Sequence, residues 1–160
     1  MKFGKLAVLT FSLSLAGATA ASAAPVTVSG SVALALAGVV APYSLLPSAQ
    51  KKAVAALFGG KSNISYVNKI IVTADKIVCR TSNVDITARS CELTFKGAKQ
   101  TISGRRASEI FATEAMAGIP ADGAAGSVSE SLSKLTCTLD PTEIRKKAGG
   151  GADCSFETGN

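Results

Sequence analysis

The stretch IIVTADKIVCRTSNVDITARSCELTF, residues 70–95, decides the fold because it carries the strongest strand pattern in the chain. β-Branched residues dominate it, and such residues fit the pleated surface of a sheet better than a helix. Ser82 and Asn83 lie in a polar break near its centre and favour a turn. The pattern predicts two antiparallel strands whose cysteines, Cys79 and Cys91, both face the core.

The chain begins with the features of a secretory signal peptide. Lys2 and Lys5 precede an apolar run, and small residues then lead to an A-x-A pattern at 21–23. The apolar run is too short to span a bilayer. We therefore expect a bacterial exported protein, periplasmic or secreted, with cleavage near Ala23 or Ala24 and no transmembrane span afterwards.

Three segments follow from this reading. We expect a signal peptide over 1–24, an apolar N-terminal arm over 25–62, and a disulfide-stapled α+β domain over 63–160. The arm is predicted to contain a short amphipathic helix at 49–58, which Ser48 caps and a glycine pair ends. Its first part, 25–46, alternates like a strand but also suits an Ala-rich helix, and the pattern alone leaves both open.

The domain after the arm combines strands with one long helix. Strand patterns recur after the opening stretch, and the helix is predicted over 104–117, where Gly118 and Pro120 stop it. The predicted fold class is α+β, with a small antiparallel sheet of about four to five strands and one main helix packed on it. No internal repeat is visible. Further strands are expected at 101–103, 128–139 and 153–157.

An even number of cysteines in an exported chain predicts disulfides instead of a metal site or a thiol catalyst. Four cysteines allow three pairings. We favour Cys79 with Cys91 and Cys137 with Cys154, because each pair closes a short loop between adjacent antiparallel strands. A tight turn at Ser82 would place a different residue opposite Cys79, so this pairing needs a longer loop or a bulge.

The chain has no histidine, which removes the commonest general base and metal ligand. Catalysis by Ser-His-Asp or Cys-His groups is therefore excluded. No CxxC spacing exists, and we expect neither a metal nor a cofactor. The GGKS sequence at 59–62 lacks the first glycine of a phosphate-binding loop and follows a helix, so it is interpreted as a helix stop.

Two basic clusters are candidate contacts for an anion or a partner. Arg105 and Arg106 occupy the first turn of the long predicted helix, where free N–H groups could help to hold an anion. Arg145, Lys146 and Lys147 precede three glycines and could meet an acidic partner or anionic headgroups. A solvated surface is the interpretation that we favour for both clusters.

Glu114 is the only polar residue on the apolar stripe of the long helix. It is the one candidate for a carboxyl with a perturbed pKa, although we favour a partly buried, hydrogen-bonded structural role for it.

Three functions are consistent with these features. The favoured one is a non-catalytic exported module that binds another envelope or extracellular protein, or stays near the envelope. The second is a small hydrolase in which Glu114 or Asp122 meets another acid or a lysine. The third is a binder of anionic surfaces. Specific nucleic-acid binding is not expected, because the chain lacks basic runs interleaved with aromatics.

Overall fold

The structure is a computed structural model that describes residues 24–59, 68–82, 89–124, 127–147 and 150–159. The predicted signal peptide lies outside these ranges except for Ala24. Most of the GGKS sequence and Asn83 of the predicted turn also lie outside them.

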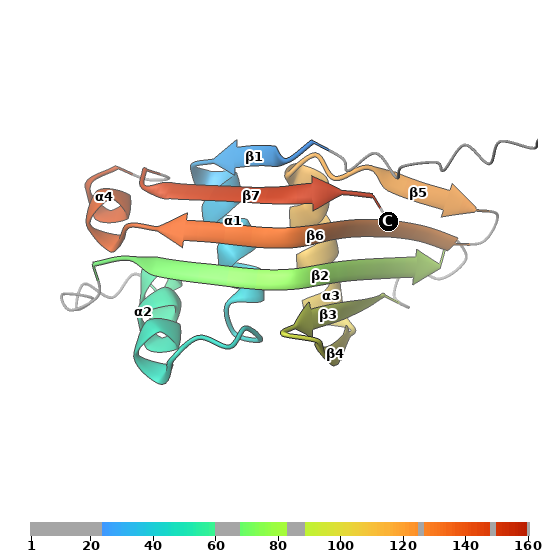
Figure 1. Cartoon of the computed structure of the whole chain (residues 1–160), viewed down its shortest axis with the longest axis horizontal. Coiled ribbons are helices and arrows are strands. Elements are labelled where there is room, and N and C mark those ends of the chain that lie inside the picture. The colour runs from blue at the N-terminus through green and yellow to red at the C-terminus, as the bar shows by residue number, and fades with distance from the viewer. Residues whose placement is uncertain (1–23, 60–67, 83–88, 125–126, 148–149, 160) are drawn as a thin grey trace, which may run out of the picture.

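The described strands form one antiparallel sheet in the order β1-β7-β6-β2-β3-β4, with β5 also paired to β6 (Figure 1). Because β2 runs along the whole of β6, β5 and β7 share the other side of β6. The seven strands in the described ranges are β1 (Val26–Ser29), β2 (Ile70–Ser82), β3 (Ser90–Phe95), β4 (Ala98–Ser103), β5 (Ala121–Ala124), β6 (Ser127–Leu139) and β7 (Ala152–Thr158).

Two helices, α1 (Ser31–Val40) and α3 (Arg105–Met116), cross the strands behind one face of this sheet (Figure 1). The shorter helices are α2 (Ser48–Phe58) and α4 (Pro141–Lys146). In the part of the chain that the structure describes, none of the helices has both the length and the apolar character needed to cross a membrane.

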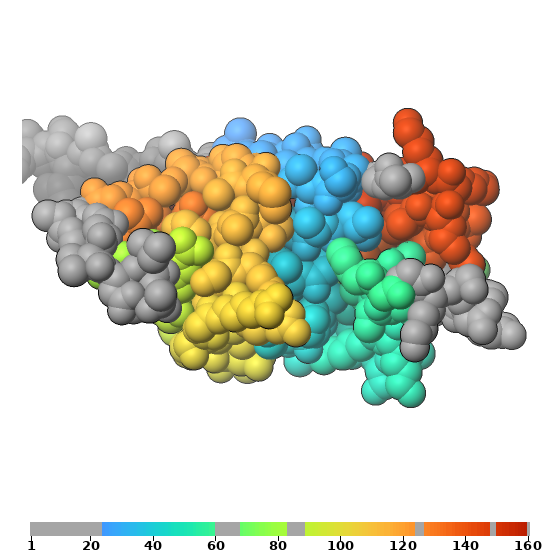
Figure 2. Space-filling model, turned by 180° about the vertical axis from the view of Figure 1, so that it is seen from behind, coloured from blue at the N-terminus to red at the C-terminus, as the bar shows by residue number. Residues whose placement is uncertain are grey.

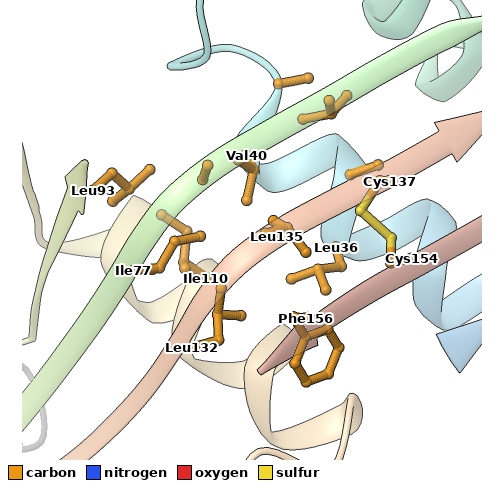
Figure 3. Close-up of a cluster of buried hydrophobic side chains, with 14 of the residues drawn as sticks. Leu36, Val40, Ile77, Leu93, Ile110, Leu132, Leu135, Cys137, Cys154 and Phe156 are labelled. Atoms are coloured by element: carbon orange, nitrogen blue, oxygen red, sulfur yellow. A yellow bond between two sulfur atoms is a disulfide. The ribbon is translucent and has the colours of Figure 1, made fainter. Parts of the chain in front are cut away.

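The hydrophobic core fills the space between the sheet and the helices α1 and α3 (Figure 3). Leu36 and Val40 of α1 meet strand residues there, and Ile110 enters from α3. Along β6 the inward positions are fully buried, whereas the outward ones are mostly Ser and Thr. The sheet is therefore covered by helices on one side, and its other side carries hydroxyl groups. The labelled strand residues of the core are Ile77, Leu93, Leu132, Leu135, Cys137, Cys154 and Phe156.

The predicted fold class is wrong in the size of the sheet and the number of helices. The predicted arm supplies β1, which pairs with β7, and α1, whose Leu36 and Val40 are fully buried. The boundary between β1 and α1 cannot be recognised in the sequence, because apolar residues alternate with other residues on both sides of Gly30. Gly30 has a φ of 74°, and this left-handed conformation lets the strand turn directly into the helix.

The other strand that the prediction missed is β5, in a segment read as a loop. Its sequence, ADGA, has little strand propensity. It is a strand because its backbone pairs with β6, with Ala121 opposite Glu130. Amino-acid composition does not indicate a strand that forms only through backbone pairing with its neighbour.

Two disulfides join neighbouring strands. Cys79 bonds to Cys91 across β2 and β3, and Cys137 bonds to Cys154 across β6 and β7. This pairing is the one that the sequence favours. The tight turn is not adopted, since β2 continues to Ser82 and Cys79 lies opposite Cys91. Two disulfides are consistent with a protein exported to an oxidising compartment.

The chain folds as two halves with the same order of main elements. The first half contributes β1, α1, β2 and β3, and the second contributes β4, α3, β6 and β7. The sheet order is symmetric about its central β2–β6 pair, because β1 pairs with β7 as β4 pairs with β3. Each half also has one disulfide, between its last two strands.

Contacts at matching positions support this equivalence. A sulfur of each disulfide lies against the carbonyl oxygen of a buried alanine in the helix of the opposite half: Cys154 Sγ is 3.3 Å from Ala33 O, and Cys91 Sγ is 3.5 Å from Ala107 O. Each alanine stands three residues after a glycine of positive φ.

The backbone at the helix starts matches as well. Gly30 N donates to Ala152 O at 2.8 Å, and Gly104 N donates to Arg89 O at 3.2 Å. The prediction of no internal repeat is therefore wrong at the level of structure. The halves share few side chains, and connections of unequal length remove any fixed spacing.

Candidate functional site

A pocket of about 780 Å³ opens between α1, α2 and α3. Figure 2 shows the face of the molecule on which these three helices gather, opposite to the exposed side of the sheet. Most of the lining is apolar, with four charged side chains among it. The lining residues are Ala35, Gly38, Val39, Ala41, Pro42, Tyr43, Lys51, Lys52, Val54, Ala55, Phe58, Arg106, Glu109 and Ile110.

Small residues create the space for this pocket. Ala35 and Gly38 of α1 and Ala55 of α2 present almost no side chain to it. At Gly38 the close approach of Phe58 is the reason for a glycine, because a Cβ atom there would lie 2.1 Å from Phe58 Cζ. A glycine within a helix costs about 1 kcal/mol relative to alanine, so this contact has to offset a loss of helix stability.

Three cations and one acid stand among the lining residues, which makes the pocket positive on balance. Lys51 Nζ donates to Pro42 O at 3.3 Å, and Lys52 is exposed. Arg106 Nη1 donates to Glu109 Oε2 at 2.8 Å, and this hydrogen bond is the main reason why the pKa of Glu109 lies below its ordinary value. Glu109 is therefore ionised and offsets one of the three positive charges.

The structure places the two predicted basic clusters on different elements. Arg105 and Arg106 both pair with Glu109, at 3.2 and 2.8 Å, and only Arg106 lines the pocket. In α4, Arg145 Nε donates to Pro141 O at 3.1 Å. Figure 1 shows α4 at one end of the molecule, with α1 between it and α3. The structure therefore does not bring the clusters together. In the remainder of the second cluster, Lys146 Nζ is 2.8 Å from Glu143 Oε1, and Lys147 is exposed.

Lys51 and Lys52, which line the pocket together with Arg106, were not predicted from the sequence. Lys51 and Lys52 look like the solvated face of a short helix. The available signal was Gly38, which interrupts the segment when 25–46 is taken as an Ala-rich helix, because a glycine inside a helix commonly marks a packing contact with another element.

A second site lies between α3 and the sheet and consists of three ionisable side chains, those of Glu114, Glu130 and Arg89. Glu114 of α3 is completely buried and Glu130 of β6 is 3% exposed. The buried side-chain atoms without a hydrogen-bond partner in the described residues are Arg89 Nε, both carboxyl oxygens of Glu114, and Glu130 Oε2. Arg89 also stacks on Phe111, with its Cζ 5.1 Å from the ring centroid. The expected hydrogen-bonded role for Glu114 is therefore wrong.

Burial controls the ionisation of both carboxyls. Burial, with a smaller contribution from the charge of nearby Glu130, raises the pKa of Glu114 to about 9. Burial likewise raises the pKa of Glu130 to about 7, whereas the positive charge of Arg89 opposes this rise. At neutral pH Glu114 is therefore protonated, and Glu130 is close to its midpoint.

The equivalent site in the other half is apolar. The symmetry of the halves matches Glu114 with Val40, because both stand ten residues after the glycine that starts their helix. Glu130 matches Val72, since Glu130 lies opposite Cys79 just as Val72 lies opposite Cys137. Arg89 matches Ala152, as the hydrogen bonds from the two glycines show.

Comparisons with protein-family models, with curated proteins and with solved structures found no significant match for this chain. Within the described ranges, no group of three or more His, Cys, Asp or Glu residues is arranged to hold a metal ion.

Proposed function

We propose that this protein is an exported, non-catalytic binding protein whose pocket holds a small amphipathic anion. The ligand class is a carboxylate on an apolar chain, such as a medium-chain fatty acid. The observation that carries this proposal is one apolar pocket with three cations among its lining residues.

The size and lining of the pocket support a small molecule. Ligand pockets in proteins commonly have volumes of about 300–1,000 Å³ and combine apolar walls with a few polar groups. Phe58, Tyr43 and Val39 would contact an apolar chain, since all three line the pocket and keep some exposed surface. This favours a small ligand over the partner protein that the sequence suggested.

The charges support an anionic headgroup. Lys51, Lys52 and Arg106 outnumber Glu109 among the lining residues, so a carboxylate would gain a favourable field and a cation would not. Lys52 is exposed and can turn toward such a group with little loss of packing.

Isothermal titration calorimetry with three probes tests the proposal. Decanoate, decanol and decyltrimethylammonium share one apolar chain and differ in charge. We expect decanoate to bind most tightly and the cation most weakly. No binding by any probe would reject the pocket as a ligand site, and equal binding by all three would reject the role of the cations.

Matched variants in α2 locate the binding. Ala55 lines the pocket and Ala49 does not, although both are exposed on the same helix. Ala55→Leu fills the pocket and should weaken decanoate binding by about tenfold or more, since several apolar contacts are displaced. Ala49→Leu should leave it unchanged. An equal effect of both variants would place the ligand elsewhere.

A carboxylate-dependent hydrolase is the second candidate, because Glu114 meets another acid, Glu130. The oxygens without partners are buried, so a substrate could reach them only after α3 moves away from the sheet. Hydrolysis of nitrophenyl esters or glycosides that is lost in Glu114→Gln would favour this candidate. Absence of such activity would leave the binding protein as the function.

The destination of the protein belongs to the same proposal. We expect cleavage of the signal peptide near Ala23 or Ala24 and delivery to the periplasm or the medium. N-terminal sequencing of the protein from the periplasmic and extracellular fractions of the native cell tests both points. A chain that still begins at Met1 would contradict the cleavage.

A further inference from the structure

The cluster of Glu114, Glu130 and Arg89 lies outside the proposed ligand pocket, since none of the three lines it. Glu114 and Glu130 have carboxyl oxygens that are buried without a partner. A buried charge without a partner is strongly unfavourable, so this cluster is stable only while at least one of its two carboxyls keeps its proton.

The other half of the molecule demonstrates that the fold does not require these polar groups. Val40, Val72 and Ala152 occupy the equivalent places, and all three are buried in the hydrophobic core. The same helix-on-sheet contact is thus made there by side chains that do not titrate. The polar cluster adds a dependence on protons that packing alone would not need.

We infer that this cluster is a proton-operated latch on α3. With both carboxyls protonated, the C-terminal half of α3 stays packed on β6. When the protons leave, two negative charges lie buried between α3 and β6, and the helix half separates from the sheet so that water can reach them. This device is independent of what the pocket binds.

The neighbouring elements offer little to neutralise the second charge. Glu130 of β6 is itself an acid, and among the described residues Arg89, just before β3, is the cation whose charge acts on Glu130. From β2, the residue opposite Glu130 is the disulfide-bonded Cys79, which does not titrate. Helix α1 contains no charged residue, and Asp122 of β5 is exposed.

One guanidinium can balance one carboxylate but not two. Arg89 is also held at the ring of Phe111. Because the pKa of Glu130 is raised to about 7 and that of Glu114 to about 9, the protons leave between neutral and mildly alkaline pH.

Amide hydrogen exchange of the disulfide-oxidised protein between pH 6 and 9 tests the latch. After correction for the intrinsic exchange rate, we expect protection in the C-terminal half of α3 to fall with rising pH. The fall should approach about tenfold for each pH unit while one proton is lost on opening. Helix α1 serves as the internal control and should stay protected.

The molecule supplies its own control sequence. Replacing Arg89→Ala, Glu114→Val and Glu130→Val introduces the residues of the other half, and should make the protection of α3 independent of pH. The double variant Glu114→Gln with Glu130→Gln should do the same with less change in volume.

Protection of α3 that is flat from pH 6 to 9 in the unmodified protein would overturn the inference. A pH-dependent loss that persists in the Gln variant would also overturn it. If the variants do not fold, carbon NMR titration of the glutamate carboxyls in the unmodified protein decides the matter. Two carboxyls that titrate above pH 6 together with α3 opening support the latch, and ordinary titration near pH 4 rejects it.

Discussion

Gly38 of α1 lies directly against the ring of Phe58 of α2, so closely that a Cβ atom at Gly38 would come within 2.1 Å of Phe58 Cζ. Phe58 is 51% exposed, so this contact fixes a side chain that otherwise faces solvent. The contact also defines one wall of the pocket.

Gly38→Ala is expected to displace the Phe58 ring and change the pocket while improving helix propensity in α1. The two effects on the free energy of unfolding oppose each other and should nearly cancel, to within about 1 kcal/mol. Decanoate binding should weaken several-fold, because one wall of the pocket moves. Calorimetry of binding and urea unfolding measure the two effects. Unchanged binding would contradict the assigned wall.

The buried acids predict an unusual pH dependence of global stability. Because the folded-state pKa values of Glu114 and Glu130 are raised, the folded protein holds more protons than the unfolded chain above about pH 4.3. The free energy of unfolding should therefore fall as pH rises from 5 to 9, by at most about 1.4 kcal/mol per pH unit for each carboxyl. Urea titrations at several pH values measure this slope.

The two carboxyls should act in different pH windows. Glu130→Gln should flatten the lower part of the slope, up to about pH 7, and Glu114→Gln should flatten the part up to about pH 9. Glu109→Gln on the same helix is the control, because the pKa of Glu109 is lowered instead of raised. It should leave the slope between pH 5 and 9 unchanged.

The disulfides should contribute similarly to stability. They close sequence separations of 12 and 17 residues, for which the chain-entropy model predicts about 3 kcal/mol each. Replacing Cys79 and Cys91 by Ala, or Cys137 and Cys154 by Ala, should therefore cost comparable free energies of unfolding. A much larger cost for one pair would mean that its contact with the opposite helix, at Ala107 or Ala33, matters more than loop closure.

The headgroup contact predicts a dependence on salt. Lys52→Gln should weaken decanoate binding by about three- to tenfold at low ionic strength and have less effect at high salt, because exposed charges are screened. Lys69→Gln is the matched control, since Lys69 is exposed and does not line the pocket. Equal losses in the two variants would show that only the net charge of the protein matters.

Strands β2 and β3 were predictable, because β2 is rich in β-branched residues and Cys91, Leu93 and Phe95 share one face of β3. The sequence pattern did not predict correctly which residues of β6 face the core. Counting by twos from Leu139 makes Leu135 inward and Glu130 outward. The register shift between Ser133 and Thr136, where Lys134 has a φ of 54°, moves the inward positions to Leu132 and Glu130. Because of this one irregular position, the sequence pattern did not indicate that Glu130 faces the core.

The pocket could not be predicted from sequence patterns either, for a different physical reason. Lys52 and Arg106 are separated by more than fifty residues and meet only because α2 and α3 both flank α1. Glu114 was identifiable, since it interrupts an apolar stripe. Its partner and its lack of hydrogen bonds depend on tertiary packing, which a helical pattern does not describe.

The pairing of β1 with β7 has a consequence for the order of events during synthesis. Val26 lies opposite Phe156, so β1 pairs with a strand that is far later in the chain. The ribosome releases β1 first, yet its edge of the sheet stays open until β7 has also emerged. Pairing of β1 within the sheet is therefore a late step of folding, and a chain truncated before β7 has no partner strand for β1.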